Sequence, residues 1–220
     1  MNVERRSVSL TELRAKTEDG EARSKIEGYA AVFNKYSEDL GGFREIIKPG
    51  AFKKALKISD VRGLHNHDSN YVWGRTSSGT LRLKEDGDGL HIENDPPDTQ
   101  WARDLIVSIN RGDINQMSFG FTVGDGGDEW NEGKDGVVTR TINEFKELFD
   151  ISTVVYPAYP DTAVALRSLT EWRNKNVEPE PAGATADADD EQVAVPMHKV
   201  KANHRRRLNE LKQKQITTKE

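Results

Sequence analysis

The sequence contains no cysteine among its 220 residues. Disulfide bonds, a thiolate nucleophile and a cysteine zinc site are therefore excluded. Any chemistry must come from a hydroxyl group, or from a metal held by histidine and carboxylates. Long apolar runs are also missing: none approaches the roughly 18–20 residues that cross a bilayer, and the first residues carry charges in place of an apolar signal segment. These absences predict a soluble, cytoplasmic protein with no membrane partner.

Hydrophobic residues are scarce, at 35% of the chain. This amount is enough for one core and leaves a polar remainder. The net charge of −5 is small, and it argues against a protein that binds nucleic acid specifically. Residues 174–220 contain an acidic tract and then a basic one, with few large apolar side chains, and we expect a disordered, charge-segregated tail. Residues 1–25 are mostly polar and are expected to form an N-terminal arm, which leaves 26–173 as the folded domain.

Short strand patterns dominate the folded domain. Residues 80–84 and 90–93 alternate between apolar and polar around a Gly-Asp turn, which predicts a hairpin. Residues 101–109 place their apolar side chains on one helical face, and a glycine stop follows at Gly112. Residues 124–136 are too polar to be anything but a loop. The predicted fold is α+β and mainly β, a closed or nearly closed barrel of about six to seven mostly antiparallel strands with flanking helices.

The candidate active site starts from Ser118, in the apolar segment 116–121. A serine in such a strand is either a small core filler or a nucleophile, and a nucleophilic serine needs a base within hydrogen-bond reach. His65 is the candidate base, although it could equally be a core histidine. Asp150 lies among apolar neighbours and needs a partner there, so it is the candidate third group or half of a structural ion pair. Glu147, nearer the start of the same strand, is its alternative.

A second pattern surrounds the candidate base. His67 and Asp68 follow His65, and the alternating spacing would put the two histidines on one face of a strand. This pattern permits a metal site, but no third group of ligands accompanies it. We therefore expect no metal and no other cofactor, and we interpret His67 as a supporting or structural residue.

Several motifs, taken in their order along the chain, resemble the prohead proteases of tailed phages. They are Gly28–Phe33, Ile46–Phe52, His65–Asp68, Met117–Phe121, and Leu148–Ser152 running into Tyr156–Tyr159. The similarity covers roughly residues 26–166, and several motifs in one order are more specific than any of them alone. That family is similar in fold to the herpesvirus assemblins. The resemblance implies that Ser118 is the nucleophile and His65 the general base. Assemblins use a second histidine as the third member, where the matching strand here offers Asp150.

The resemblance also implies a function, partners and a location. It implies a serine endopeptidase that cleaves the scaffolding segment from the major capsid protein, and also cleaves itself, inside the immature procapsid in the host cytoplasm. The tail would then be a packaging signal or a substrate for self-cleavage. One alternative is a catalytically inactive scaffold or capsid-assembly factor of the same fold. Another is a metal hydrolase that uses His65, His67 and Asp68.

Overall fold

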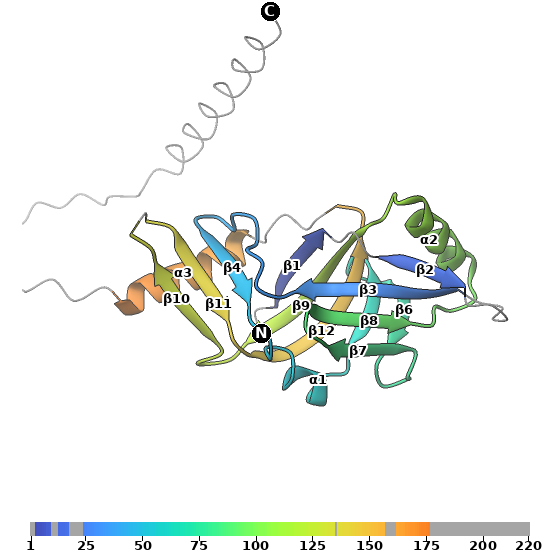
Figure 1. The fold of residues 1–220 in the computed structure, drawn as a ribbon, viewed down its shortest axis with the longest axis horizontal. Helices are drawn as coiled ribbons and strands as arrows, with labels where there is room; N and C mark the ends of the chain where they lie inside the picture. The colour runs from blue at the N-terminus through green and yellow to red at the C-terminus, as the bar shows by residue number, and fades with distance from the viewer. Residues whose placement is uncertain (1–2, 10–12, 18–23, 135, 157–161, 177–220) are drawn as a thin grey trace, which may run out of the picture. The chain divides into compact units, whose positions relative to one another are not determined.

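The computed structural model describes residues 3–9, 13–17, 24–134, 136–156 and 162–176, which contain twelve strands and three helices (Figure 1). The elements are β1 (Glu4–Ser9), β2 (Arg14–Thr17), β3 (Ser24–Val32), β4 (Phe43–Ile47), α1 (Ala55–Ile58), β5 (Arg62–His65), β6 (Asp68–Arg75), β7 (Leu81–Glu85), β8 (Gly89–Asn94), α2 (Gln100–Arg111), β9 (Gln116–Val123), β10 (Asp128–Glu132), β11 (Val138–Ile142), β12 (Phe145–Val154) and α3 (Thr162–Asn176). Among these residues, no helix is long and apolar enough to cross a membrane.

The strands form three open sheets, so the expected closed barrel is wrong. The first sheet has the order β1-β9-β12-β5-β6, the second β2-β3-β8-β7, and the third β10-β11-β4. A barrel closes only when the two outer strands of a sheet pair with each other, and the outer strands of these sheets do not. The number of strands also exceeds the expectation, because polar segments such as Asp128–Glu132, inside the predicted loop, pair with a neighbouring strand.

The N-terminal segment, expected to be an arm, supplies two strands to the sheets. β1 pairs antiparallel with β9, and β2 pairs antiparallel with β3. The polar residues Glu4 and Arg6 of β1 are buried as ion-paired side chains. At the other end, α3 continues to Asn176, and the rest of the expected tail lies outside the described residues.

Two local predictions are confirmed. β7 and β8 form the expected antiparallel hairpin, with Leu83 opposite Ile92. α2 ends where the glycine stop predicted: Gly112 has a φ of 81° and its N–H bonds to the carbonyl of Ile109. Both features depend on short-range patterns, apolar alternation around a turn and a glycine that adopts the left-handed conformation at low cost.

The core supports strand β9 from one side. Met117, Phe119 and Phe121 are completely buried. Phe119 stacks on Phe121 with ring centroids 5.1 Å apart, and Phe145 of β12 lies 4.8 Å from Phe121. Because side chains alternate along a strand, residues Ser118 and Gly120 face away from these rings. The aromatic packing therefore fixes the position of the face that carries Ser118.

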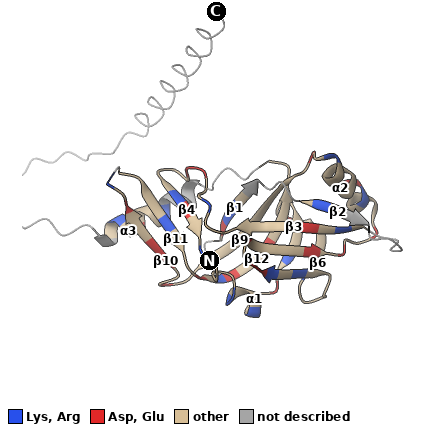
Figure 2. Cartoon of the chain, viewed as in Figure 1, with Lys and Arg blue, Asp and Glu red and all other residues tan. Residues whose placement is uncertain are grey.

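A buried group of charged side chains joins the first sheet to the third. We call it the ionic cluster; its members are Glu4, Arg6, Glu45, Asp128 and Arg140. Arg6 of β1 donates to both carboxylate oxygens of Glu45 in β4, and Arg140 of β11 donates to both oxygens of Glu4. Elsewhere, basic and acidic residues are interspersed along the elements (Figure 2).

Candidate active site

A tight turn between β5 and β6 carries the residue that completes the site. His65 pairs with Asp68, so Asn66 and His67 form a two-residue loop, and their φ angles are 52° and 57°. Positive φ at both central positions is typical of the commonest hairpin turns. Asn accepts this conformation readily, but for other non-glycine residues it costs about 1–2 kcal/mol. His67 therefore has an uncommon backbone conformation, which the contacts of the turn help to hold.

The turn is fastened to the end of β12 through Asn66. Its backbone N–H donates to the carbonyl of Thr153 at 2.8 Å, and its side-chain Oδ1 accepts from the N–H of Val155 at 3.1 Å. These bonds place the turn against β12. As a result, the His67 side chain reaches the residues of β12 and β9 instead of continuing the line of β5.

The pairing of β9 with β12 positions the other residues of the candidate site. Ser118 lies opposite Ser152, and Gly120 lies opposite Asp150. Directly opposite residues in an antiparallel pair project to the same face. Asp150 and Ser152 are two residues apart in unbroken register with Gly120 and Ser118, so the Asp150 carboxylate lies on the face that carries Ser118. The bulge in β12 lies just before this segment, between Leu148 and Asp150.

The His67 imidazole bridges Ser118 and Asp150. Its Nε2 lies 2.8 Å from Ser118 Oγ, and its Nδ1 lies 2.6 Å from Asp150 Oδ2. An ionised carboxylate only accepts hydrogen bonds, so the Nδ1–H donates to Asp150 and the Nε2 lone pair accepts the Ser118 hydroxyl. A hydroxyl, an imidazole and a carboxylate in this series can activate the serine as a nucleophile.

Gly120 leaves the space that the Asp150 carboxylate occupies. A Cβ atom at this position would lie 2.6 Å from Asp150 Oδ1, which is shorter than any ordinary non-bonded contact. Ser118 and Gly120 are two residues apart and share one face of β9, so the glycine clears room next to the serine. A glycine two residues after Ser118 is therefore needed to make room for the Asp150 carboxylate.

The structure replaces His65 with His67 as the residue that contacts Ser118. His65 is in register with Thr153, which is in register with Met117, so these three residues share the opposite face of the sheet. The His65 Nδ1 lies 3.0 Å from Thr153 Oγ1, and its Nε2 lies 3.1 Å from the side-chain amide of Asn66. The structure places His65 away from Ser118, because residues 65–68 form a turn and not the straight strand that the prediction assumed.

The bonds of His65 also fix its protonation. The amide nitrogen of Asn66 can only donate, so Nε2 accepts and the proton sits on Nδ1, facing Thr153. Burial lowers the pKa of His65, against smaller raising contributions from the Thr153 hydrogen bond and from Asp68. A neutral His65 with both nitrogens occupied supports the turn and has no free position for a proton from Ser118.

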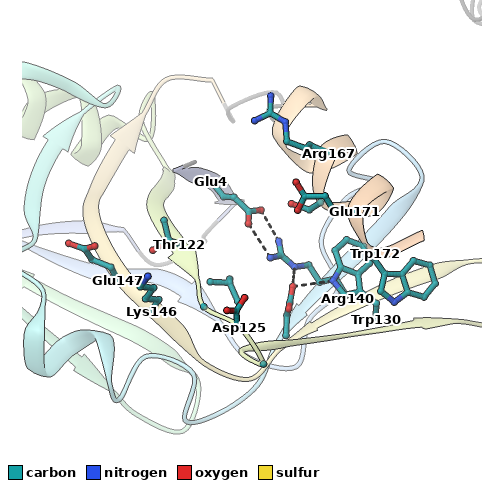
Figure 3. Close-up of a pocket in the computed structure, with 15 residues that line it drawn as sticks. Glu4, Thr122, Asp125, Trp130, Arg140, Lys146, Glu147, Arg167, Glu171 and Trp172 are labelled. Atoms are coloured by element: carbon teal, nitrogen blue, oxygen red, sulfur yellow. Dashed lines mark hydrogen bonds and ion pairs between the residues drawn. The ribbon is translucent and has the colours of Figure 1, made fainter. Parts of the chain in front are cut away.

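Glu147, the alternative third group, lies away from the imidazole. It pairs with Thr122 and lines a pocket of about 780 Å³ beside the ionic cluster (Figure 3). Trp130 and Trp172 stack with ring centroids 5.8 Å apart at the pocket's other side. None of Ser118, His67 and Asp150 lines this pocket. Of the two acids considered from the sequence, only Asp150 contacts the histidine.

The metal alternative finds no ligand set in the described part of the chain. No group of three or more His, Cys, Asp or Glu side chains is placed to hold an ion there. The turn sends His65 and His67 to opposite faces of the sheet, and Asp68 instead accepts two bonds from Asn70.

Sequence reasoning missed that the His-Asn-His-Asp segment is a turn. The available signal was Asn66, since asparagine is favoured at the first position of a two-residue hairpin loop. A turn at Asn66 and His67 would have separated the two histidines and singled out the second. The register that sets Asp150 opposite Gly120 left no comparable signal, because it depends on pairing with a distant strand.

The serine, histidine and aspartate thus define the class: a protein with the constellation of a serine hydrolase. Residues 11–175 match the family model described as caudovirus prohead serine protease. Since the match spans well over half of the chain, the protein belongs to this family, and it is a capsid maturation protease by family. No curated protein matches the chain.

A solved structure is similar to part of the chain. It is the capsid assembly protease of bacteriophage T4, at 13% identity and a TM-score of 0.44, with 70% of this chain and 98% of that chain covered. A TM-score below 0.5 does not establish a shared fold, so the family assignment rests on the family model alone.

Proposed function

We propose that the protein is a serine endopeptidase in which Ser118 is the nucleophile, His67 the general base and Asp150 the residue that orients the imidazole. The observation that carries this proposal is the continuous hydrogen-bonded series from Ser118 Oγ through both nitrogens of His67 to Asp150. An inactive scaffold of the same fold would have no need to keep this series, or a histidine with a positive φ.

The chemistry follows from the positions of the protons. Ser118 Oγ attacks the peptide carbonyl carbon, and its proton passes to Nε2 of His67. The C–N bond then breaks as Nε2 gives that proton to the departing amine, and an acyl ester on Ser118 remains. Water attacks the ester, its proton passes to Nε2, and the proton returns to Ser118 as the acid product leaves. Asp150 keeps the imidazole in the required tautomer and stabilises the imidazolium.

Access to the nucleophile requires a rearrangement. Ser118 is 0% exposed and Asp150 only 7%. A peptide carbonyl must come within van der Waals contact of Oγ, so the residues that cover Ser118 have to move when substrate binds. This burial suits a protease that stays inactive until a particular substrate or assembly is present.

The substrate we propose is the scaffolding segment of the major capsid protein, together with the protease itself, and the site of action is the immature procapsid in the host cytoplasm. The family membership supports this proposal, since its description is that of a prohead protease. No cofactor takes part in the proposed chemistry.

Co-expression with the phage's major capsid protein tests the function. Mass analysis of the capsid protein should show removal of a segment with the unaltered protease and none with Ser118→Ala. Ser78→Ala is the matched control, because Ser78 is an exposed serine in a turn; it should cleave normally. Cleavage at the normal rate by Ser118→Ala would contradict the proposed function.

A further inference from the structure

Ser152 is a second buried serine in contact with the proposed catalytic residues. It lies directly opposite Ser118 on the neighbouring strand and is 0% exposed. The His67 ring lies between the two: Nε2 is 2.8 Å from Ser118 Oγ, and Nδ1 is 3.2 Å from Ser152 Oγ. Each ring nitrogen therefore faces one serine hydroxyl.

The hydrogen bonds distinguish the roles of the two serines. Ser152 donates its proton to Asp150 Oδ2 at 2.7 Å, the same oxygen that accepts the Nδ1–H of His67. The Nδ1 nitrogen that faces Ser152 carries the proton donated to Asp150, so no imidazole lone pair is available to remove the Ser152 hydroxyl proton. Ser118 alone faces the free lone pair of the imidazole.

The Ser152 hydroxyl also accepts a bond from the backbone of the histidine. The N–H of His67 points at Ser152 Oγ at 3.3 Å. This N–H belongs to the residue with a φ of 57°. One hydroxyl group therefore contacts the strained backbone, the imidazole nitrogen and the carboxylate at the same time.

We propose that Ser152 is a positioning residue of the protease, one that holds the Asp150 carboxylate and the His67 backbone so that Nε2 stays aimed at Ser118. The expected change in kcat rests on the proposed function, whereas the expected change in the hydrogen bonds of His67 does not. Without the hydroxyl, the Asp150 oxygen loses a donor, and the partly buried N–H of His67 loses its acceptor. An unsatisfied buried donor costs about 1–3 kcal/mol, which favours relaxation of the turn away from its positive φ.

A neighbouring residue provides a matched control. Thr153 is also a completely buried hydroxyl residue of β12, but its Oγ1 bonds to His65 on the opposite face of the sheet. Thr153→Val and Ser152→Ala each remove one buried hydroxyl from the same strand. A general effect of losing a hydroxyl would appear in both variants, and a positioning effect in Ser152→Ala alone.

The structural test is proton NMR in the Ser118→Ala background, which prevents self-cleavage. A proton held between imidazole and carboxylate resonates far downfield, and the His67 Nδ1–H should give this signal. Adding Ser152→Ala should shift the signal upfield or broaden it beyond detection, whereas adding Thr153→Val should leave it in place. A signal unchanged by Ser152→Ala would overturn the proposal.

The kinetic test uses the active protease. Misplacement of a catalytic group by about 1 Å costs on the order of 100-fold in rate, so Ser152→Ala should lower kcat on the order of 10–100-fold and leave KM within about twofold. Ser152→Cys keeps a weak donor on a slightly larger side chain, and it should restore part of kcat; it also serves if the alanine variant does not fold. A normal kcat in both variants would overturn the proposal. Persistent cleavage by Ser118→Ala would instead contradict the proposed function, and the NMR signal would still decide the role of Ser152.

Discussion

The proposed catalytic network consists of Ser118, His67, Asp150 and Ser152. This network and the ionic cluster are both largely buried, both cross between strands distant in sequence, and both satisfy their polar groups almost entirely within the protein. They differ in whether they contain a proton that can be transferred. The ionic cluster contains two arginines and three carboxylates, and an arginine is the donor of every bond between its members. The catalytic network contains a neutral hydroxyl and an imidazole, whose proton can be exchanged. Burial and hydrogen bonding alone therefore do not identify an active site; a transferable proton next to a nucleophile does.

The electrostatics show the same difference. Burial alone would raise the pKa of Glu4, but Arg140 and Arg6 lower it below its ordinary value by hydrogen bonding and charge. Burial opposes the charge of Arg140 too, while Glu45 and Glu4 raise its pKa. Glu4 and Arg140 thus hold each other in the charged form. This arrangement suits a structural junction between sheets. A mutation in the ionic cluster should therefore lower mainly the stability, and a mutation in the proposed catalytic network mainly the activity.

The largest expected effect is on the catalytic side, from Asp150→Asn. The amide keeps the size of the carboxylate but favours the wrong imidazole tautomer, and the same change in a serine protease triad of known mechanism lowers kcat about 10⁴-fold. We expect a loss of cleavage of about 10³–10⁴-fold with little change in the free energy of unfolding. Kinetics on a capsid-protein substrate and urea unfolding measure the two quantities. A variant that retains most of its activity would exclude Asp150 from the proposed role.

Arg140→Met should produce the opposite pattern. It removes the cation that bridges Glu4 and Asp128, and a buried pair broken on one side costs about 3–5 kcal/mol. Urea unfolding in the Ser118→Ala background should show this loss. With Ser118 intact, the folded protein should keep its kcat within about tenfold. A large loss of kcat with unchanged stability would mean that the cluster belongs to the active site.

Gly120→Ala tests the space beside Asp150. The added Cβ forces the carboxylate away from its position, and we expect kcat to fall on the order of 10–100-fold. Gly124→Ala is the control, because its Cβ would meet Lys146 only at 3.5 Å or more. Equal kinetics for the two alanine variants would show that Asp150 is not confined by Gly120.

The smallest effect concerns acid stability. The pKa of Glu4 is lowered on folding, so its contribution to stability is fully present above its ordinary pKa of 4.5 and is lost as the pH falls from there through the lower, folded-state value. Glu4→Gln should be less stable at neutral pH and should lose stability less steeply below pH 4.5. Unfolding curves at several pH values, again in the Ser118→Ala background, measure the slope. Identical slopes would show that Glu4 is not held by the arginines.

Local patterns in the sequence predicted local structure well. The hairpin of β7 and β8, the helix α2 with its Gly112 stop, and the burial of the Ser118 strand all depend on residues close together in the chain. Ser118 and Asp150 were singled out for the same reason, since each polar residue stands out among apolar neighbours. The structure places both on one face of the first sheet.

Features that depend on distant pairing were not predictable in this way. The register that places Asp150 and Ser152 opposite Gly120 and Ser118 exists only when β12 is aligned with β9. The polar strand β1 can be buried because Arg6 forms an ion pair with Glu45, 39 residues away in the chain. The open sheets likewise follow from which strands pair. His67 was predictable in part. Asn66 is a local signal for a two-residue turn, and a turn there would have singled out His67 as the histidine that leaves the line of β5.

Replacing each histidine of the β5–β6 hairpin separately tests the central claim most directly. The measurement is the rate of capsid-protein cleavage by His67→Ala and by His65→Ala, with folding of each variant checked by its unfolding curve. We predict a loss of at least about 10³-fold for His67→Ala, because Ser118 loses its base, and a loss of less than about tenfold for His65→Ala, which removes only a support of the turn. The reverse order, with His67→Ala active and His65→Ala inactive, would contradict the account.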